Sequence, residues 1–342
     1  MIFVNFAILI IGFVALIKGA DFFVDGSASL ARKFGIPSVI IGLTIVALGT
    51  SAPELAVSTS AALQGSNEIA FSNVVGSNIF NLLVVLGVCA IIHPVPVDKA
   101  ILKRDFPFTI VASIFLLLTS GYLALFGSSR AVVAKELEAM LSGTLPEGAM
   151  DAYVGGVSRI IGISLIVMFA AYIIRLVMVS KNSAEEEPDG QNSEISMGKS
   201  LLMIVFGLAL IVAGGQAVVN SAKYIAAAAG MSETLIGLTV VALGTSLPEL
   251  VTSIVAARKG ETGLAVGNVV GSNIFNLMFI LGISAMINPI SINMASLFDL
   301  MILIAISLMA FSFCVSGEKI ERKEGIVMVA AYAADMLFAI VR

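Results

Sequence analysis

The chain has 342 residues, of which 58% are hydrophobic and only 12% are charged, with a formal net charge of −4 at pH 7. Soluble domains carry about 25% charged residues, and a soluble fold of this length could not enclose so much apolar surface. The composition therefore excludes an ordinary soluble protein and predicts an all-α integral membrane protein in a lipid bilayer.

Apolar stretches long enough to cross the hydrocarbon core, about 20 residues, recur along the whole chain. We predict ten transmembrane helices, at residues 2–28, 37–63, 70–92, 105–126, 156–179, 198–228, 232–258, 265–287, 296–316 and 323–341. The first stretch lacks a basic leader and a small-residue cleavage site, so we interpret it as a retained span and not as a signal peptide.

Two connections between the predicted spans are long. The loop 127–155 contains the charged run 135–138 and is expected to hold a short surface helix. The segment 181–197 contains EEEPDG at 185–190, a composition typical of a solvated linker. We therefore predict a first five-helix repeat at 1–180, a cytoplasmic linker at 181–197 and a second repeat at 198–342.

The basic residues predict the orientation. With the N-terminus outside, twelve of the nineteen Lys and Arg residues fall in cytoplasmic loops, in accordance with the positive-inside rule. The chain is therefore expected to be a multi-pass protein of the cell membrane with both termini outside.

The two halves of the chain repeat each other. A shift of 195 residues aligns 41–87 with 236–282, with 30 identities in 47 positions, and 73–82 recurs unchanged as 268–277. Because each half has five predicted spans, an odd number, the two halves must face opposite ways in the membrane. Inverted repeats are typical of secondary transporters, whose binding site lies near the midplane where the repeats meet.

Glu54 and Glu249 occupy equivalent positions well inside the spans 37–63 and 232–258. A carboxylate at that depth costs at least about 2.5–3.5 kcal/mol on insertion scales. A buried, protonated Glu that joins two helices would be the structural explanation, but here the whole polar neighbourhood is duplicated with it. The pair therefore indicates a functional site.

Oxygen atoms surround both carboxylates in the sequence. The hydroxyl-bearing neighbours are Thr50, Ser51, Thr245 and Ser246. Pro53 and Pro248 each remove a backbone donor and are expected to break their helix. The backbone carbonyls of Ala47 and its neighbours, and that of Ala242 in the second half, are therefore candidates to face a cavity. Irregular backbone at membrane depth is tolerated where it lines such a cavity.

The following span of each half completes this set. Its polar residues are spaced by four and share one helix face: Asn73, Ser77 and Asn81 in the first half, and Asn268, Ser272 and Asn276 in the second. Asn73 and Asn268 fit an interhelical hydrogen bond as well as they fit a ligand. Gly76 and Gly271 would allow close helix approach.

Two carboxylates with hydroxyl, amide and carbonyl oxygens, and without His or Cys, are ligands for hard cations. Such a set suits Ca²⁺ and Na⁺ better than Zn²⁺ or Cu²⁺, and Mg²⁺ dehydrates reluctantly. Two Glu charges balance one Ca²⁺ or nearly balance several Na⁺, which is the equality that an exchanger needs. No cofactor or nucleic-acid partner is expected, the ions being substrates, and no oligomeric state is assigned.

The duplicated Gly-Thr-Ser-x-Pro-Glu segments, at 49–54 and 244–249, resemble the alpha repeats of the sodium/calcium exchanger family, within the cation/calcium antiporter group. The resemblance implies ten helices in two inverted halves, and first and sixth helices that slide to gate access. It also implies three Na⁺ per Ca²⁺ and electrogenic transport. By motif position, it assigns the cation ligands to Glu54, Glu249, Thr50, Ser51, Thr245, Ser246, Ser77, Asn81, Ser272, Asn276 and the backbone oxygens of Ala47 and Ala242.

Some members of the family, including potassium-dependent ones, carry Asp where this chain has Asn276, so the resemblance argues against K⁺ co-transport. A proton/calcium antiporter of the same fold is the main alternative, because buried carboxylates can titrate. A channel is disfavoured by the internal inverted symmetry. An intramembrane enzyme is disfavoured because no Ser/His, Cys/His or His-rich metal motif accompanies the two Glu.

The first and sixth spans are less alike than the central ones. Lys18, Asp21 and Asp25 align with the neutral residues Ala213, Gln216 and Asn220 under the same shift. Lys18 and Asp21 are one turn apart and are expected to pair near the inner interface. A cation-attracting vestibule at Asp21 and Asp25 is the alternative.

Overall fold

The computed structural model describes residues 2–122, 126–127, 130–141, 149–186, 195–230 and 242–341. The helices of the first half are α1 (Ile2–Phe34), α2 (Ser38–Ile41), α3 (Ala47–Thr50), α4 (Ala52–Leu63), α5 (Asn67–Phe80), α6 (Leu86–Ile92), α7 (Phe106–Ser120), α9 (Arg130–Leu141) and α10 (Arg159–Glu186). Those of the second half are α11 (Met197–Ala228), α13 (Ala242–Thr245), α14 (Leu247–Arg258), α15 (Thr262–Ile274), α16 (Leu281–Ile287), α17 (Met294–Gly317) and α18 (Arg322–Val341).

Short irregular and extended elements connect these helices. The π-helical turns are η1 (Gly42–Val46), η2 (Asn81–Val85), η3 (Ile101–Asp105) and η6 (Phe275–Ile280), and η4 (Ala149–Asp151) is a 3₁₀ turn. The strands are β1 (Val95–Pro96), β2 (Tyr153–Val157), β3 (Ile290–Asn293) and β4 (Lys319–Ile320). β1 pairs antiparallel with β4, and β2 with β3, so each ladder joins the first half of the chain to the second.

Six helical segments of the described residues are long and apolar enough to cross a bilayer. They are Ile2–Phe34, Glu68–Ile92, Arg159–Val179, Met197–Ala228, Thr262–Ile287 and Met294–Gly317. Counting Ser38–Thr50 and Ala52–Leu63 as one broken span, bent by 48°, gives a seventh. The prediction of a multi-helix membrane protein is therefore confirmed, whereas the number ten stays a prediction.

The three remaining predicted spans fall short for identifiable reasons. Helix α7 ends at Ser120, before the predicted end at 126, and charged residues 103–105 precede it. Of the span 232–258, only the part from Ala242 lies in the described residues. Helix α18 carries three charges, 322–324, in its first turn.

The long connections differ in part from the prediction. A surface helix is present between the spans, as expected, and it is α9. The solvated linker was predicted to begin at 181, but α10 continues as helix to Glu186, two residues into the EEEPDG run. Glu is compatible with helix, and the helix-breaking Pro188 comes only after this point. Residues 187–194 lie outside the described part of the chain.

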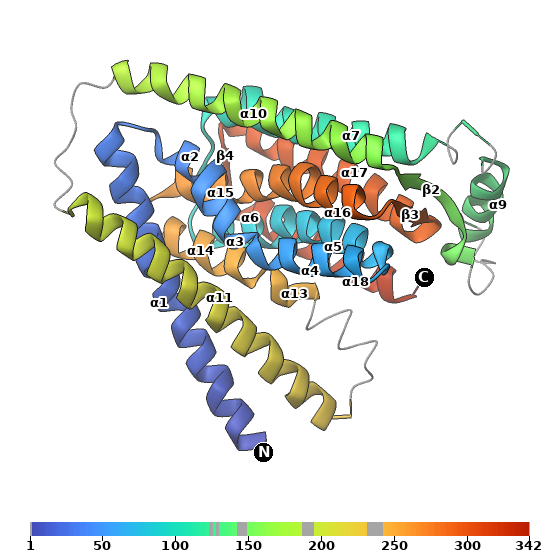
Figure 1. The fold of residues 1–342 in the computed structure, drawn as a ribbon, viewed down its shortest axis with the longest axis horizontal. Coiled ribbons are helices and arrows are strands. Elements are labelled where there is room, and N and C mark those ends of the chain that lie inside the picture. Colours follow the sequence, from blue (N-terminus) through green and yellow to red (C-terminus); the bar gives the residue numbers. More distant parts are fainter. Residues whose placement is uncertain are drawn as a thin grey trace.

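Helices α1 and α11 lie against each other and extend away from the remaining helices (Figure 1). Glycines make this close contact possible. A Cβ atom on Gly19 would lie 2.8 Å from the Gly207 carbonyl oxygen, and one on Gly12 would lie 3.0 Å from that of Gly214. Side chains on the outer faces of the pair are apolar and exposed, as in Phe3 at 84%, as expected for lipid contact.

The helices that carry Glu54 and Glu249 are broken at the same point of the repeat. Ser51 leaves helical geometry (φ −82°, ψ 9°) between α3 and α4, and Ser246 does so (φ −91°, ψ 6°) between α13 and α14. Each proline stands at the start of the second helix, where its missing N–H is not needed. The helix breaks predicted from Pro53 and Pro248 are confirmed, and they place both Glu side chains at helix N-termini.

Glycine packing also brings the two halves together around this point. A Cβ on Gly271 would lie 2.7 Å from the Cα of Leu43, so the close approach expected at Gly271 is confirmed. Gly76, its counterpart, meets no described atom within 4 Å. The segment that corresponds to Leu43 in the second half, 238, lies outside the described residues.

Candidate functional site

Each Glu carboxylate accepts a hydrogen bond from a serine of the other half of the chain. Ser246 Oγ donates to Glu54 Oε1 at 3.0 Å, and Ser51 Oγ donates to Glu249 Oε1 at 2.9 Å. Ser77 Oγ lies 3.5 Å from the same Glu54 oxygen and 3.2 Å from Ser246 Oγ. These reciprocal contacts bring two helix breaks, 195 positions apart in sequence, into one site.

Both carboxylates are fully buried, with 0% exposure. Among the described residues, neither of them forms an ion pair with a basic side chain. A buried carboxylate without a positive partner is costly. A cation bound between the two carboxylates would offset this cost.

Two asparagines from the next helices are held in place by two further asparagines. Asn81 Nδ2 donates to Asn273 Oδ1 and Asn276 Nδ2 donates to Asn78 Oδ1, each at 3.1 Å. Asn78 Nδ2 in turn donates to the backbone carbonyl of Asn273 at 3.2 Å. Because their amide nitrogens are used in these bonds, the side chains of Asn81 and Asn276 keep their oxygens available.

Several buried oxygens of this site have no hydrogen-bond partner in the described residues. They are Glu54 Oε2, Glu249 Oε2, Asn81 Oδ1, Asn276 Oδ1 and Thr245 Oγ1. Buried polar atoms are almost always paired, so five unpaired oxygens on residues of one site require an explanation. All five are acceptors or hydroxyl oxygens, which are ligands for hard cations.

The π-helical turns help to present these groups. Asn81 is the first residue of η2, and Asn276 lies in η6. Such turns inside α-helices are rare and frequently occur at functional sites. Both amides therefore lie in a π-helical turn, at positions that match under the 195-residue shift.

Asn73 and Asn268 have structural partners of their own. Asn73 Nδ2 donates to Ser58 Oγ and Asn268 Nδ2 donates to Ser253 Oγ, both at 2.9 Å. Thr50 Oγ1 donates to Asn268 Oδ1 at 3.0 Å and lies 3.5 Å from Ser272 Oγ. These two asparagines therefore form hydrogen bonds between neighbouring helices, which is one of the two roles predicted for them.

The backbone carbonyls behave differently from the expectation. The Ala47 oxygen was expected to be released by Pro53, but it accepts from Ser51 N at 3.0 Å and lies 3.4 Å from Thr50 Oγ1. Proline removes the donor to the carbonyl four residues earlier, which is that of Gly49. Ala242 is the first residue of α13, at the edge of the described part of the chain.

One open cavity, of about 450 Å³, reaches the site. It lies between α4, α11 and the α13–α14 break, and we call it the access cavity. Its wall includes Thr245, and also Pro53 and Pro248, which directly precede the two Glu residues. The cavity therefore extends to Thr245, one of the residues with an unpaired oxygen.

Sequence reasoning did not identify four residues that hold this site together: Asn78, Asn273, Ser58 and Ser253. Asn78 and Asn273 stand in the string that repeats without change, three residues before Asn81 and Asn276, which is one helical turn. A polar residue at mid-membrane in both copies was the available signal. Serines at 58 and 253 also match under the 195-residue shift.

The expected contact between Lys18 and Asp21 is present at 3.4 Å. Sequence reasoning missed the stronger partner of these acidic residues, Lys259, whose Nζ lies 2.7 Å from Asp25 and 3.3 Å from Asp21. Asp21 and Asp25 are therefore neutralised by lysines in this structure and do not form a free acidic vestibule.

Comparison with known proteins gives consistent matches over the whole chain. A family model described as sodium/calcium exchanger protein matches residues 4–178 and 199–341. The chain is 36% identical over 356 residues to the sodium/calcium exchanger MaX1 of Methanosarcina acetivorans, covering 98% of this chain and 99% of that protein. It is also 36% identical over 334 residues to the putative antiporter CaxA of Alkalimonas amylolytica, with 95% of each covered.

A similar fold has been solved. The chain matches the sodium-calcium exchanger NCX_Mj, soaked with Na⁺ and Sr²⁺, with a TM-score of 0.77 and 31% sequence identity. The match covers 98% of this chain and 99% of that one.

Proposed function

The chain belongs to the sodium/calcium exchanger family, and on this premise we propose that it exchanges Ca²⁺ for Na⁺ at the site around Glu54 and Glu249. Members of this family are membrane antiporters, so the chain is a multi-pass cation/calcium antiporter and not an enzyme. Beyond membership of the family, we propose the identity of the coupling ion, the ligand residues and the stoichiometry of exchange.

The unpaired buried oxygens carry the proposal. Glu54 and Glu249 each keep one carboxylate oxygen without a partner, and Asn81 and Asn276 each keep one amide oxygen. Ca²⁺ takes 6–8 oxygen ligands, and such a shell can be assembled here from side-chain and backbone oxygens. We propose as ligands Thr50, Ser51, Thr245, Ser246, Ser77, Asn81, Ser272, Asn276, Glu54, Glu249 and the carbonyls of Ala47 and Ala242. The Ala47 carbonyl accepts from Ser51 N, and the proton of the nearby Thr50 hydroxyl goes to Asn268 Oδ1, so one lone pair of this carbonyl remains for a cation.

The same oxygens favour Na⁺ over H⁺ as the coupling ion. A proton on a Glu would supply a donor for one neighbouring acceptor at most. At least one of the amide oxygens of Asn81 and Asn276 would then still lack a partner, whereas metal ions can coordinate all of the unpaired oxygens together. Two carboxylates without a third acidic ligand also support transport that does not depend on K⁺.

We further propose that ten helices cross the membrane, as two inverted repeats at 1–180 and 198–342 joined by the linker 181–197. The exchange of partners between the halves supports this arrangement. Ser51 reaches Glu249 while Ser246 reaches Glu54, as in any two-fold arrangement. Twelve of nineteen basic residues would then lie inside, with both termini outside.

Charge counting makes the exchange electrogenic. With both Glu ionised, the site and one Ca²⁺ sum to zero, whereas the site and three Na⁺ sum to +1. Each elementary charge moved through the membrane potential is worth about 2.3 kcal/mol per 100 mV. A negative interior would therefore drive Na⁺ in and Ca²⁺ out.

Calcium uptake into proteoliposomes tests the proposal, with Na⁺, K⁺ and pH gradients imposed one at a time. Only an outward Na⁺ gradient is expected to drive uptake. In Na⁺-loaded vesicles, an inside-positive potential set with valinomycin should accelerate uptake, because net positive charge leaves, and an inside-negative potential should slow it. Uptake driven by pH alone would support the proton-coupled alternative.

A further inference from the structure

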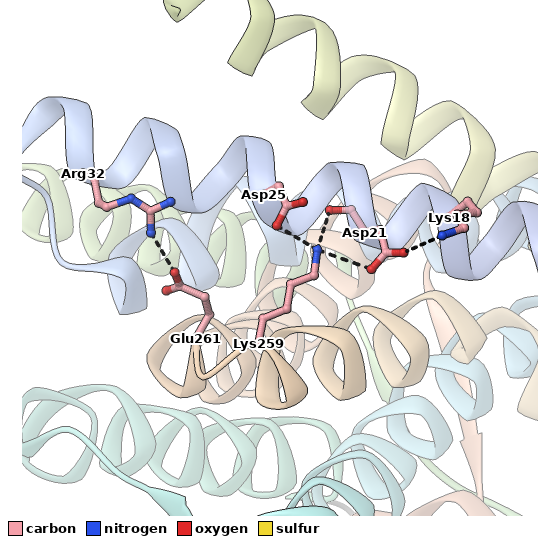
Figure 2. A network of polar contacts seen from close by, with 6 residues as sticks. All are labelled: Lys18, Asp21, Asp25, Arg32, Lys259 and Glu261. Carbon is pink, nitrogen blue, oxygen red and sulfur yellow. Dashed lines mark hydrogen bonds and ion pairs between the residues drawn. The ribbon is translucent and has the colours of Figure 1, made fainter. Parts of the chain in front are cut away.

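Ion pairs join α1 to the turn between α14 and α15. Lys259 Nζ lies 2.7 Å from Asp25 Oδ1 and 3.3 Å from Asp21 Oδ1, and it donates to the Asp21 backbone oxygen at 3.2 Å. Two residues later, Glu261 Oε1 lies 2.8 Å from Arg32 Nη1. Figure 2 shows both contacts along one side of α1.

A glycine sets the shape of this turn. Gly260 has a φ of +79° and separates the two charged residues, so that Lys259 and Glu261 both reach α1. The equivalent turn of the first half has the same design, since Gly65 has a φ of +77°. Its flanking residues, however, are the neutral Gln64 and Ser66.

The neutral counterparts line the access cavity. Under the 195-residue shift, Lys259 and Glu261 correspond to Gln64 and Ser66. Asp21 and Asp25 correspond to Gln216 and Asn220 on α11, and these four neutral residues all lie in the cavity wall. The same positions are therefore bridged by charges at one end of the molecule and separated by open space at the other.

Burial shows the same contrast. Ser60 is exposed in the access cavity, whereas its counterpart Val255 is 9% exposed. Val57 lines the cavity, whereas its counterpart Thr252 is 0% exposed. Helix α1 packs along α14, but α11 and α4, the corresponding pair, are the two walls of the access cavity.

We propose that Asp21, Asp25, Arg32, Lys259 and Glu261 form an ionic latch, which holds the inner passage closed while the outer one is open. Lys259 is the central positioning residue, because it contacts two acidic residues of α1. The latch has to open in each transport cycle before ions are released inside. The inference rests on the proposed function for its meaning in transport and on the proposed orientation for the words inner and outer.

The latch has a strength suited to repeated opening. Its side chains are partly exposed, with Lys259 at 30%, Asp21 at 32% and Asp25 at 46%. Partly exposed ion pairs contribute modestly and are screened by salt. The latch can therefore bias the conformational equilibrium without locking it, and higher ionic strength should favour the inward-open form.

Cysteine accessibility tests the latch through a matched pair of reporters. Ala56→Cys lies in the access cavity, and Val251→Cys is its counterpart at the other end. The native Cys89 and Cys314 are buried, so they add little background. Each reporter is labelled with a membrane-impermeant maleimide from either side of sealed vesicles, in an ion-free buffer.

Lys259→Gln gives the inner position the residue found at its outer counterpart. We expect labelling of Val251→Cys from the inner side to accelerate about threefold to tenfold, without acceleration at Ala56→Cys. Lys259→Arg should retain the original labelling. Lys33→Gln, which removes one positive charge from the same end of α1, is the matched control and should leave both reporters unchanged.

Unchanged labelling of Val251→Cys in Lys259→Gln would overturn the proposal, and so would equal acceleration at both reporters, which indicates general loosening. If Lys259→Gln does not fold, Asp25→Asn, which matches the outer Asn220, replaces it with the same expectation. Labelling does not require transport. The latch proposal can therefore be refuted while the proposal of Na⁺/Ca²⁺ exchange is confirmed, and the exchange proposal can be refuted while the latch is confirmed. Reporters that react from the opposite sides would contradict the orientation alone.

Discussion

The central segments of the two halves are nearly copies of each other, whereas α1 and α11 have diverged. Between 41–87 and 236–282, 30 of 47 positions are identical. In α1 and α11 the glycines of the contact recur, Gly12 and Gly19 matching Gly207 and Gly214, but the polar residues do not. The two sequences are most alike where both copies contribute residues to one site. Their charged residues differ where one end of the molecule has the access cavity and the other end is closed by ion pairs.

The largest expected effect comes from breaking the site in either copy. Glu54→Gln and Glu249→Gln should each abolish calcium transport in a folded protein. The amide keeps the shape but loses the charge that compensates Ca²⁺ for its lost water, so binding should weaken by about 3–5 kcal/mol, or more than a hundredfold.

Calcium flux in proteoliposomes measures this effect. Glu68→Gln, on a half-buried carboxylate at the start of α5 that lies outside the site and accepts a hydrogen bond from Tyr153 Oη, serves as the control and should transport normally. A near wild-type rate in either site variant would show that the carboxylate concerned is not a calcium ligand.

A second, smaller effect is expected where only the glycines repeat. Gly19→Ala would place a Cβ 2.8 Å from the Gly207 carbonyl and the Ile211 nitrogen. Separating α1 from α11 should destabilise the protein by about 1–3 kcal/mol and lower its Tm in detergent. Gly198→Ala is the matched control, because its Cβ would meet no described atom within 4 Å. Equal Tm values for the two variants would show that close contact of α1 and α11 is not needed.

The positioning asparagines sharpen the comparison further. Asn78→Ala and Asn273→Ala each remove the acceptor that orients Asn276 or Asn81. One neutral hydrogen bond contributes about 1 kcal/mol, so the apparent affinity for Ca²⁺ should fall about fivefold, equally in both variants. Titration of transport against Ca²⁺ measures the shift. Strongly unequal losses would mean that the two halves bind different ions.

The smallest expected effect is that of K⁺. Because Asn81 and Asn276 are both neutral, replacing K⁺ with choline on both sides of the membrane should leave the rate nearly unchanged. A collapse of Na⁺-driven flux in choline would show that K⁺ binds at this site without a third carboxylate.

Sequence reasoning pointed to the residues of the candidate site because its signals are local. A Glu at membrane depth, a Pro one residue before it and an unchanged second copy could all be read without knowing the fold. The helix breaks at Ser51 and Ser246 follow from the same prolines. What remained out of reach depends on contacts across the chain: Lys259 with Asp25, 234 residues apart, and Asn78 with Asn276, 198 residues apart.

The carbonyl prediction illustrates a different limit. Pro53 correctly indicated a break, but whether the Ala47 oxygen keeps a partner depends on how Ser51 turns, and its N–H returns to that oxygen. The sequence alone also does not decide the number of spans. Charged residues just before α7 and in the first turn of α18 leave only short apolar segments in these two helices.

Equilibrium binding of Ca²⁺ to the purified protein, with Na⁺ as competitor, tests the central claim most directly. If several Na⁺ and one Ca²⁺ use the same oxygens in turn, Na⁺ should displace Ca²⁺ completely and with a Hill coefficient above one, whereas K⁺ and choline should not. Glu54→Gln and Glu249→Gln should bind no Ca²⁺ under the same conditions. Calcium binding that is indifferent to Na⁺, or that persists in both variants, would contradict a shared site built on the two carboxylates.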